Sequence, residues 1–280
     1  MRIFGYKRSG TSTSTADVQA GDFDNYWALN IVDTPLAAKK AWESNDVAVG
    51  GINDSIGTSW EDLSNVDADN SYLTQTGVAT IYVSSSAIGD DYYAATSGGA
   101  RIVRLHYLDT SWDEQTADAY MSGLSDVEIA SDVMRVNKLE VVSVGDSGSA
   151  AGNITAHSGG TTYLQIDEET NESYGGYYYV PDGKNLVITD AMCYPRLDNA
   201  TDLEFAYRIE EPKVVGATTN YIENYEWAGS YITSGSTNAP SSVITPIIVR
   251  DRCRIRVRAR ATGTGKAIGY FKGYLIYKKE

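Results

Sequence analysis

Residues 250–260 read Arg250-Asp-Arg252-Cys-Arg254-Ile-Arg256-Val-Arg258-Ala-Arg260, with an arginine at every second position. Alternate side chains of a β-strand lie on one face. A strand here would therefore align all the arginines over about 33 Å, at a rise of about 3.3 Å per residue. Its other face would carry Cys253, Ile255, Val257 and Ala259, which suits a core. The pattern predicts an amphipathic strand, and the rest of the chain is interpreted outward from it.

From about residue 78 onward, short runs of β-branched and aromatic residues alternate with polar ones, and clusters of Gly, Ser, Asn and Asp separate them. Helical periodicity is scarce in this region. We therefore predict an all-β fold, an antiparallel β-sandwich of jelly-roll type. The predicted strands cover residues 78–83, 101–108, 134–142, 161–166, 176–180, 186–192, 203–209, 253–261 and 267–277.

The first 76 residues differ from the rest. Residues 11–15 are a low-complexity run of Thr and Ser, and residues 34–43 could form a short helix with Thr34 as N-cap and Pro35 at the first helical position. Gly50-Gly51 is expected to interrupt the chain. We predict that residues 1–76 form an arm or small subdomain that orders by docking, for example on another subunit. Residues 77–280 are predicted to form the sandwich, as one unit or as two smaller ones.

Composition restricts the function classes. The chain has 280 residues with 23 Lys and Arg against 37 Asp and Glu, a formal net charge of −14. Such an acidic chain does not favour nucleic acid, because phosphate neutralisation needs a basic face. No stretch approaches the roughly 20 apolar residues of a membrane helix, and the first ten residues lack the apolar region of a secretory signal. We expect no membrane partner.

Motifs for catalysis or cofactors are missing from the sequence. It contains no phosphate-binding loop, serine-hydrolase elbow or zinc-protease signature. His106 and His157 are too few for a multi-histidine metal site, and Cys193 and Cys253 are expected to be small buried hydrophobic residues. We predict no enzyme activity, no catalytic residue, no cofactor and no metal.

Acidic clusters leave a second interpretation open. Residues 167–169 with Glu172, and Asp67 with Asp69, are either solvated turns or oxygen ligands for Ca²⁺, although no calcium-loop motif is present. As a pair of glycosidase carboxylates they are undetermined, because the sequence does not give their separation.

The arginine pattern itself has three readings. Aligned guanidinium groups repel one another unless carboxylates or phosphates lie opposite. The arginines could form a solvated outer face paired with Asp and Glu of neighbouring strands, meet an acidic surface on a neighbouring subunit, or bind nucleic acid, which the acidic chain disfavours. The interface hypothesis assigns to this surface Arg250, Arg252, Arg254, Arg256, Arg258 and Arg260.

Tyrosine is over-represented, with 21 Tyr against 4 Phe. Tyrosine is enriched in protein–protein interfaces, and the alternative is that these rings are core residues at sheet edges. Residues 214–243 are expected to form a long binding or assembly loop. The tyrosine-rich segments are Tyr92-Tyr93 and residues 177–179, and the aromatic interface candidates are Tyr221, Tyr225, Trp227 and Tyr231.

Several blocks in order resemble a family of virion structural proteins of marine tailed phages. They are residues 84–91 running into 98–109, 134–145 with 151–155, 165–166 with 178–184, and 254–259 with 271–276. Asp182 stands where the family tends to have Ala, and Arg252-Cys253 stands in place of Thr-Asp. The resemblance covers roughly residues 78–280 and carries over no catalytic residue.

The resemblance implies a non-enzymatic bacteriophage virion protein. We expect a capsid decoration (cement) protein or a head or tail appendage subunit, located in the virion. Its partners would be copies of itself, in a trimer or ring, and other virion proteins such as the major capsid protein. The alternative is a tail-fibre or tail-spike protein that binds a receptor or host glycan, with exposed aromatics near residues 221–231. A glycan-cleaving enzyme is a third hypothesis.

Overall fold

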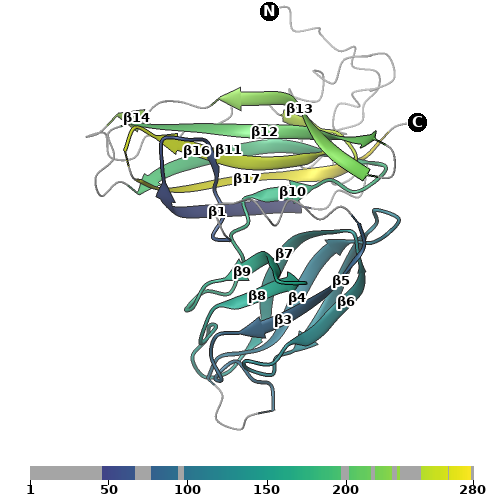
Figure 1. The fold of residues 1–280 in the computed structure, drawn as a ribbon, viewed down its shortest axis with the longest axis vertical. Coiled ribbons are helices and arrows are strands. Elements are labelled where there is room, and N and C mark those ends of the chain that lie inside the picture. The colour runs from purple at the N-terminus through teal and green to yellow at the C-terminus, as the bar shows by residue number, and fades with distance from the viewer. Residues whose placement is uncertain are drawn as a thin grey trace, which may run out of the picture.

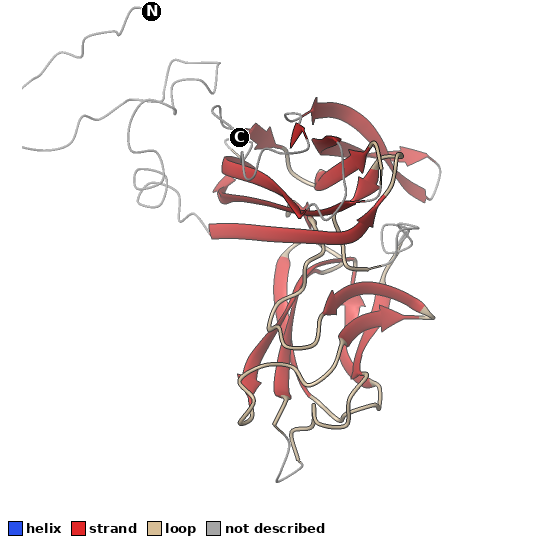
Figure 2. Cartoon of the chain, turned by 90° about the vertical axis from the view of Figure 1, so that its left-hand side faces the viewer, coloured by secondary structure: helices blue, strands red, loops and turns tan. Residues whose placement is uncertain are grey.

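The computed structural model describes residues 46–66, 77–93, 98–196, 202–215, 218–228, 232–233, 247–263 and 265–278. Within these ranges the regular structure consists of strands β1 to β17, with no helix, and every strand pairing is antiparallel (Figure 2). The prediction of an all-β antiparallel fold is confirmed for the described part of the chain. The predicted helix at residues 34–43 and the polar run at 11–15 lie outside it.

One group of strands, the major unit, forms the upper half of Figure 1. It comprises β1 (Asp46–Ile56), β2 (Glu61–Asp62), β10 (Tyr177–Tyr179), β11 (Lys184–Arg196), β12 (Asp202–Val215), β13 (Thr218–Ala228), β14 (Ile232–Thr233), β15 (Ile247–Val249), β16 (Arg254–Ala261) and β17 (Gly265–Tyr277).

Two sheets make up the major unit. One has the order β1-β17-β11-β15, and the other has the order β10-β16-β12-β13, with β2 added to β16 and β14 to β12. Both sheets contribute side chains to one core, for example Leu186 and Phe271 from the first and Phe205 and Val257 from the second. The apolar face predicted for β16, with Cys253, Ile255, Val257 and Ala259, is buried there as expected.

The second group, the inserted unit, lies in the chain between β2 and β10 (Figure 1). Its sheets have the orders β6-β3-β8-β9 and β5-β4-β7, and together they enclose a separate core. Its strands are β3 (Ala79–Ser85), β4 (Ala100–Leu108), β5 (Glu114–Tyr120), β6 (Val127–Val133), β7 (Arg135–Val144), β8 (Ile154–Ser158) and β9 (Thr161–Ile166).

Strand β10 joins the two units because its side chains alternate between their cores. Tyr178 packs into the core of the major unit, whereas Tyr177 and Tyr179 pack into that of the inserted unit. The Asn137 side chain donates from Nδ2 to the Tyr179 carbonyl (3.0 Å) and accepts from the Tyr179 N–H at Oδ1 (2.8 Å). The Tyr178 hydroxyl donates to Glu114 across the same junction (3.0 Å). These contacts fix the inserted unit against the major unit.

The prediction that residues 1–76 form a separate arm or subdomain is wrong for the residues of this segment that the structure describes. Residues 46–56 form β1, which pairs with β17, and residues 61–62 form β2, which pairs with β16, so both belong to the sheets of the major unit. Gly50 and Gly51, expected to interrupt the chain, lie within β1. Gly51 is needed for a close approach of the backbone: a Cβ there would overlap the Leu63 carbonyl oxygen and lie 2.7 Å from the Cα of Gly176.

Two further expectations need correction. The long loop predicted at residues 214–243 contains β13, which pairs with β12, because its Thr, Tyr, Ile and Trp residues favour strands. The arginine strand starts at Arg254 rather than at Arg250. The Cys253 N–H donates to the Arg250 carbonyl (3.2 Å), and Arg252 has φ 57, so residues 250–253 form a turn.

The Gly51→Ala substitution is expected to destabilise the protein by about 1–3 kcal/mol, the usual cost of overpacking, because its Cβ would meet backbone atoms on two sides. Urea unfolding followed by circular dichroism measures the change. Gly263→Ala is the matched control, since its Cβ meets nothing within 4 Å. Equal stabilities of the two variants would contradict the proposed close approach.

Candidate functional site

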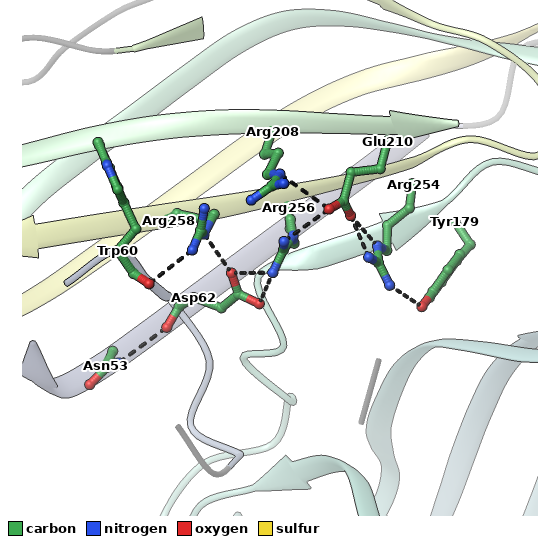
Figure 3. Close-up of polar contacts among 9 residues, drawn as sticks. All are labelled: Asn53, Trp60, Asp62, Tyr179, Arg208, Glu210, Arg254, Arg256 and Arg258. Atoms are coloured by element: carbon green, nitrogen blue, oxygen red, sulfur yellow. Dashed lines mark hydrogen bonds and ion pairs between the residues drawn. The ribbon is translucent and has the colours of Figure 1, made fainter. Parts of the chain in front are cut away.

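The arginines of β16 lie on the face of the sheet opposite the major core. Arg254 and Arg256 are only 5% and 7% exposed, and they lie beside Tyr179 and Tyr177, their register partners in β10. Strand β2 pairs with β16 in the same sheet, and the side chain of Asp62 lies against Arg256 (Figure 3). Because burial removes hydration from these cations, carboxylates must replace it.

Glu210, on the neighbouring strand β12, holds one end of the cluster. Its Oε2 accepts from Arg254 Nε (2.7 Å), and its Oε1 accepts from Arg256 Nη2 (2.9 Å). Arg208 Nε lies 3.2 Å from the same Oε1. Arg254 also donates from Nη1 to the Tyr179 hydroxyl (3.1 Å), which connects the cluster to the junction between the units.

Asp62, on β2, holds the other end. Arg256 Nη1 donates to both of its carboxylate oxygens (2.8 and 2.7 Å), and Arg258 Nε lies 3.2 Å from Oδ1. Arg258 Nη2 donates to the Trp60 carbonyl (2.8 Å). Arg256 therefore bridges Asp62 and Glu210 (Figure 3). The buried cluster, as we call it, consists of Asp62, Arg208, Glu210, Arg254, Arg256 and Arg258.

The charge state of the buried cluster follows from this geometry. Burial alone would raise the pKa of Glu210, but the charges of Arg254 and Arg256 outweigh it and hold the pKa below the ordinary value of 4.5. Burial alone would likewise lower the pKa of Arg256, and the charges of Asp62 and Glu210 reverse this. Glu210 and Arg256 are therefore ionised at neutral pH.

The six arginines of the predicted interface surface have carboxylate neighbours in their own chain. Arg250 lies near Glu211 (3.8 Å), Arg252 pairs with Asp182 (2.7 Å), and Arg260 pairs with Glu204. The prediction of cross-strand acidic partners is confirmed, but the expected solvated face is wrong for Arg254 and Arg256, which are buried and contact Tyr179, Asp62 and Glu210. For these two residues a role in contacting a neighbouring subunit is excluded by burial. The assignment of Arg250, Arg252, Arg258 and Arg260 to the interface stays a prediction.

The aromatic interface candidates lie in or near β13. Tyr221, Tyr225 and Trp227 are opposite Pro212, Ile209 and Tyr207 of β12 in the backbone register. Tyr231 lies outside the described residues. The other tyrosine segments have separate environments: residues 177–179 are buried, and Tyr92 and Tyr93 are exposed.

Polar groups elsewhere form local contacts. His157 Nε2 lies 3.2 Å from Ser84 Oγ and 3.2 Å from Asp126 Oδ1. Because both contacts use the same ring nitrogen, the imidazole does not link the hydroxyl to the carboxylate as in a catalytic triad. His106 Nε2 lies 2.9 Å from Glu140 Oε1.

The two cysteines and the possible metal ligands are the remaining candidates for chemistry. Burial raises the pKa of the Cys193 and Cys253 thiols to about 12, which agrees with the expected buried hydrophobic role. No group of three or more His, Cys, Asp or Glu side chains within the described ranges could hold a metal ion. Asp67 and Asp69 lie outside those ranges. The part of the chain that the structure describes has no helix able to cross a membrane.

Sequence reasoning did not find Asp62, Glu210, Trp60 or Tyr179 as members of this site. Glu210 could have been found from the sequence. It ends an alternating segment and lies at even spacing from Glu204 and Arg208, so the three side chains are expected on one face of a strand. Asp62 gave no such signal, because it pairs with Arg256 across 194 positions of the chain.

Comparison with known proteins does not place the chain in a family. No family model matches it, and no curated protein matches it. Among solved structures, a chain of the "Structure of infectious bursal disease virus Gt strain" shares 8% identity, covering 85% of this chain and 81% of that chain, with a TM-score of 0.11. A TM-score that low carries no argument.

The Glu210→Gln variant is expected to lose about 3–5 kcal/mol of stability, the usual cost of leaving buried charges without their partner. Urea unfolding measures this loss. Asp182→Asn is the matched control, because the Asp182–Arg252 pair is largely exposed, and it should cost at most about 1 kcal/mol. Similar losses in both variants would show that burial does not govern the strength of these pairs.

The dependence of the free energy of unfolding on pH should reveal the ionisation of the Glu210 carboxylate. The pKa of Glu210 is lower in the folded than in the unfolded protein. Its carboxylate therefore contributes fully to the free energy of unfolding above its unfolded pKa, and this contribution is lost as the pH falls through the folded pKa. We expect the stability difference between wild type and Glu210→Gln to shrink from about pH 6 to about pH 3. A difference that stays constant over this range would contradict an ionised Glu210.

Proposed function

We propose that this chain is a non-enzymatic structural protein of a bacteriophage virion, a capsid decoration or head or tail appendage subunit that acts through oligomeric contacts. The strand order of the major unit is the observation that carries this proposal. The resemblance of the sequence blocks to phage virion proteins points in the same direction.

The eight strands on the two sheet paths can be ranked by their order in the chain. One sheet then holds the first, eighth, third and sixth strands, and the other the second, seventh, fourth and fifth. Consecutive strands alternate between the sheets except for the β12–β13 hairpin. We interpret this order as a jelly roll, with two sheets packed as a sandwich, an architecture that occurs in viral capsid domains as well as in lectins and cupins.

The inserted unit fits an assembly role because of where it enters. It lies between the first two strands of the proposed jelly roll and extends from one side of it (Figure 1). In a virion, the major unit would contact neighbouring subunits or the capsid, and the inserted unit would project. A net charge of −14 would limit non-specific adhesion to nucleic acid.

The alternative of a receptor-binding or glycan-binding tail protein is favoured by one observation. Tyr92, Tyr93 and Tyr120 are 40%, 78% and 50% exposed on the inserted unit. These rings are not those expected near residues 221–231, but they supply the free aromatic surface that this alternative requires. A lectin-type role is also compatible with a jelly roll.

Light scattering behind a sizing column tests the structural proposal. We expect a trimer or ring that does not depend on Arg254 and Arg256, because these buried arginines are already paired within the chain. Arg250 and Arg260 stay assigned to the interface, so the double variant Arg250→Glu, Arg260→Glu should lower the measured mass. A monomer under all conditions would contradict an oligomeric subunit, and an oligomer kept by the double variant would contradict the arginine interface.

A further inference from the structure

The exposed tyrosines of the inserted unit form one contiguous patch. Tyr120 points outward from β5, since its neighbours Ala119 and Met121 are buried in the core. The Tyr92 ring lies 4.5 Å from the Tyr120 ring at 66°, and 5.1 Å from the Tyr93 ring at 84°. These three residues are called the tyrosine patch. Neighbouring rings of the patch meet edge to face, so a ligand can stack on one ring and contact the next ring from the side.

The patch lies at the end of the inserted unit remote from the major unit. Strand β5 starts at Glu114, which contacts Tyr178 of the major unit, and ends at Tyr120. The strand thus leads from the junction to the free end (Figure 1). In the described structure the patch is open to solvent.

A buried carboxylate fixes the loops that carry the patch. Asp90 is fully buried and accepts hydrogen bonds from Ser85 Oγ (2.6 Å) and from the N–H groups of Ala100 (2.6 Å), Ala151 (2.9 Å) and Gly152 (3.1 Å). The Tyr92 N–H donates to the Met121 carbonyl (2.9 Å), which ties the two loops together. A patch held in this way is preorganised, and binding to it would order little further backbone.

Hydrogen-bonding groups continue from the patch along the same outward face. Asp118 precedes Tyr120 by two residues on β5, so both side chains share this face. Its carboxylate accepts from Arg104 Nε (2.7 Å) and Nη2 (2.8 Å), and both side chains are about two-fifths exposed. Their remaining donors and lone pairs are available to hydroxyl groups of a ligand.

We propose that the tyrosine patch and the adjoining Arg104–Asp118 pair bind a neutral oligosaccharide. Pyranose rings with equatorial hydroxyls present a face of C–H groups that packs on an aromatic ring, while their hydroxyls reach the polar pair. This inference gives a site and a ligand class to the glycan-binding alternative described above. It does not rest on the proposed structural role, since it holds for any assembly that leaves the inserted unit exposed.

Size and charge favour this ligand over other occupants. A stable protein interface needs about 20–30 residues a side, whereas the surface described here consists of the patch, one ion pair and two exposed aliphatic residues on the same loops, Ile88 and Leu124. An anionic ligand is disfavoured by the net charge of −14. A neutral glycan of one or two sugar units matches both constraints.

Affinity electrophoresis in native gels tests the proposal on the full chain, which migrates toward the anode because its pI is about 4.6. The probes are hydroxyethylcellulose, laminarin and galactomannan, with anionic alginate as a counter-probe. We expect retardation by at least one neutral polysaccharide. The variants Tyr93→Ala and Tyr120→Ala should each weaken it roughly tenfold, the change produced by a loss of about 1.4 kcal/mol.

Tyr277→Ala is the matched control, because Tyr277 is a 57% exposed tyrosine on the major unit, and it should be retarded like the wild type. Thermal unfolding would verify that each variant is folded. Absence of retardation by all neutral probes, retardation by alginate alone, or equal retardation of the patch variants and wild type would overturn the proposal. Patch variants that change the mass in light scattering would identify the surface as a protein interface and would also overturn it.

Discussion

The pairing of buried arginines on β16 with Asp62 and Glu210 is the interaction on which the arrangement of the major unit depends. Transferring a guanidinium group out of water is costly unless a well-placed carboxylate replaces its hydration. Arg256 satisfies this condition only when β2 and β12 both flank β16, since one carboxylate comes from each strand. The ion pairs therefore favour one strand arrangement over others that would be equally apolar.

The same constraint reaches the junction between the two units. Arg254 donates to the Tyr179 hydroxyl, and the Tyr179 backbone is bonded to Asn137 of the inserted unit. Arg135 of the inserted unit lies over the Tyr179 ring, 5.5 Å from its centroid, and over Trp112 at 5.3 Å. Tyr179 thus contacts one cation from each unit, so a change in the buried cluster would alter the contacts at the junction.

How much could be predicted from the sequence depends on how far each interaction extends along the chain. Alternation in residues 254–260 was sufficient to predict a strand with Ile255 and Val257 in the core, because the period of a strand is a local property. The covering of its arginine face could not be predicted, since it is supplied by Asp62 and Tyr179 from distant segments. Gly51 was misread for the same reason: its neighbour Leu63 matters only once β1 and the following segment are folded together.

Burial, more than residue type, separates structural from binding surfaces in this protein. Arginine and tyrosine are both common at interfaces, and the sequence offered an arginine strand and several tyrosine clusters as candidates. The fold uses Arg254 and Arg256 internally, where their charges are already matched. It leaves the tyrosines at the free end of the inserted unit exposed on loops that Asp90 holds rigid. A rigid, exposed aromatic surface can bind a ligand, whereas the ion pairs of Arg254 and Arg256 are buried and out of reach of one. Recognition is therefore expected at the inserted unit, and the buried ion pairs contribute to the stability of the major unit.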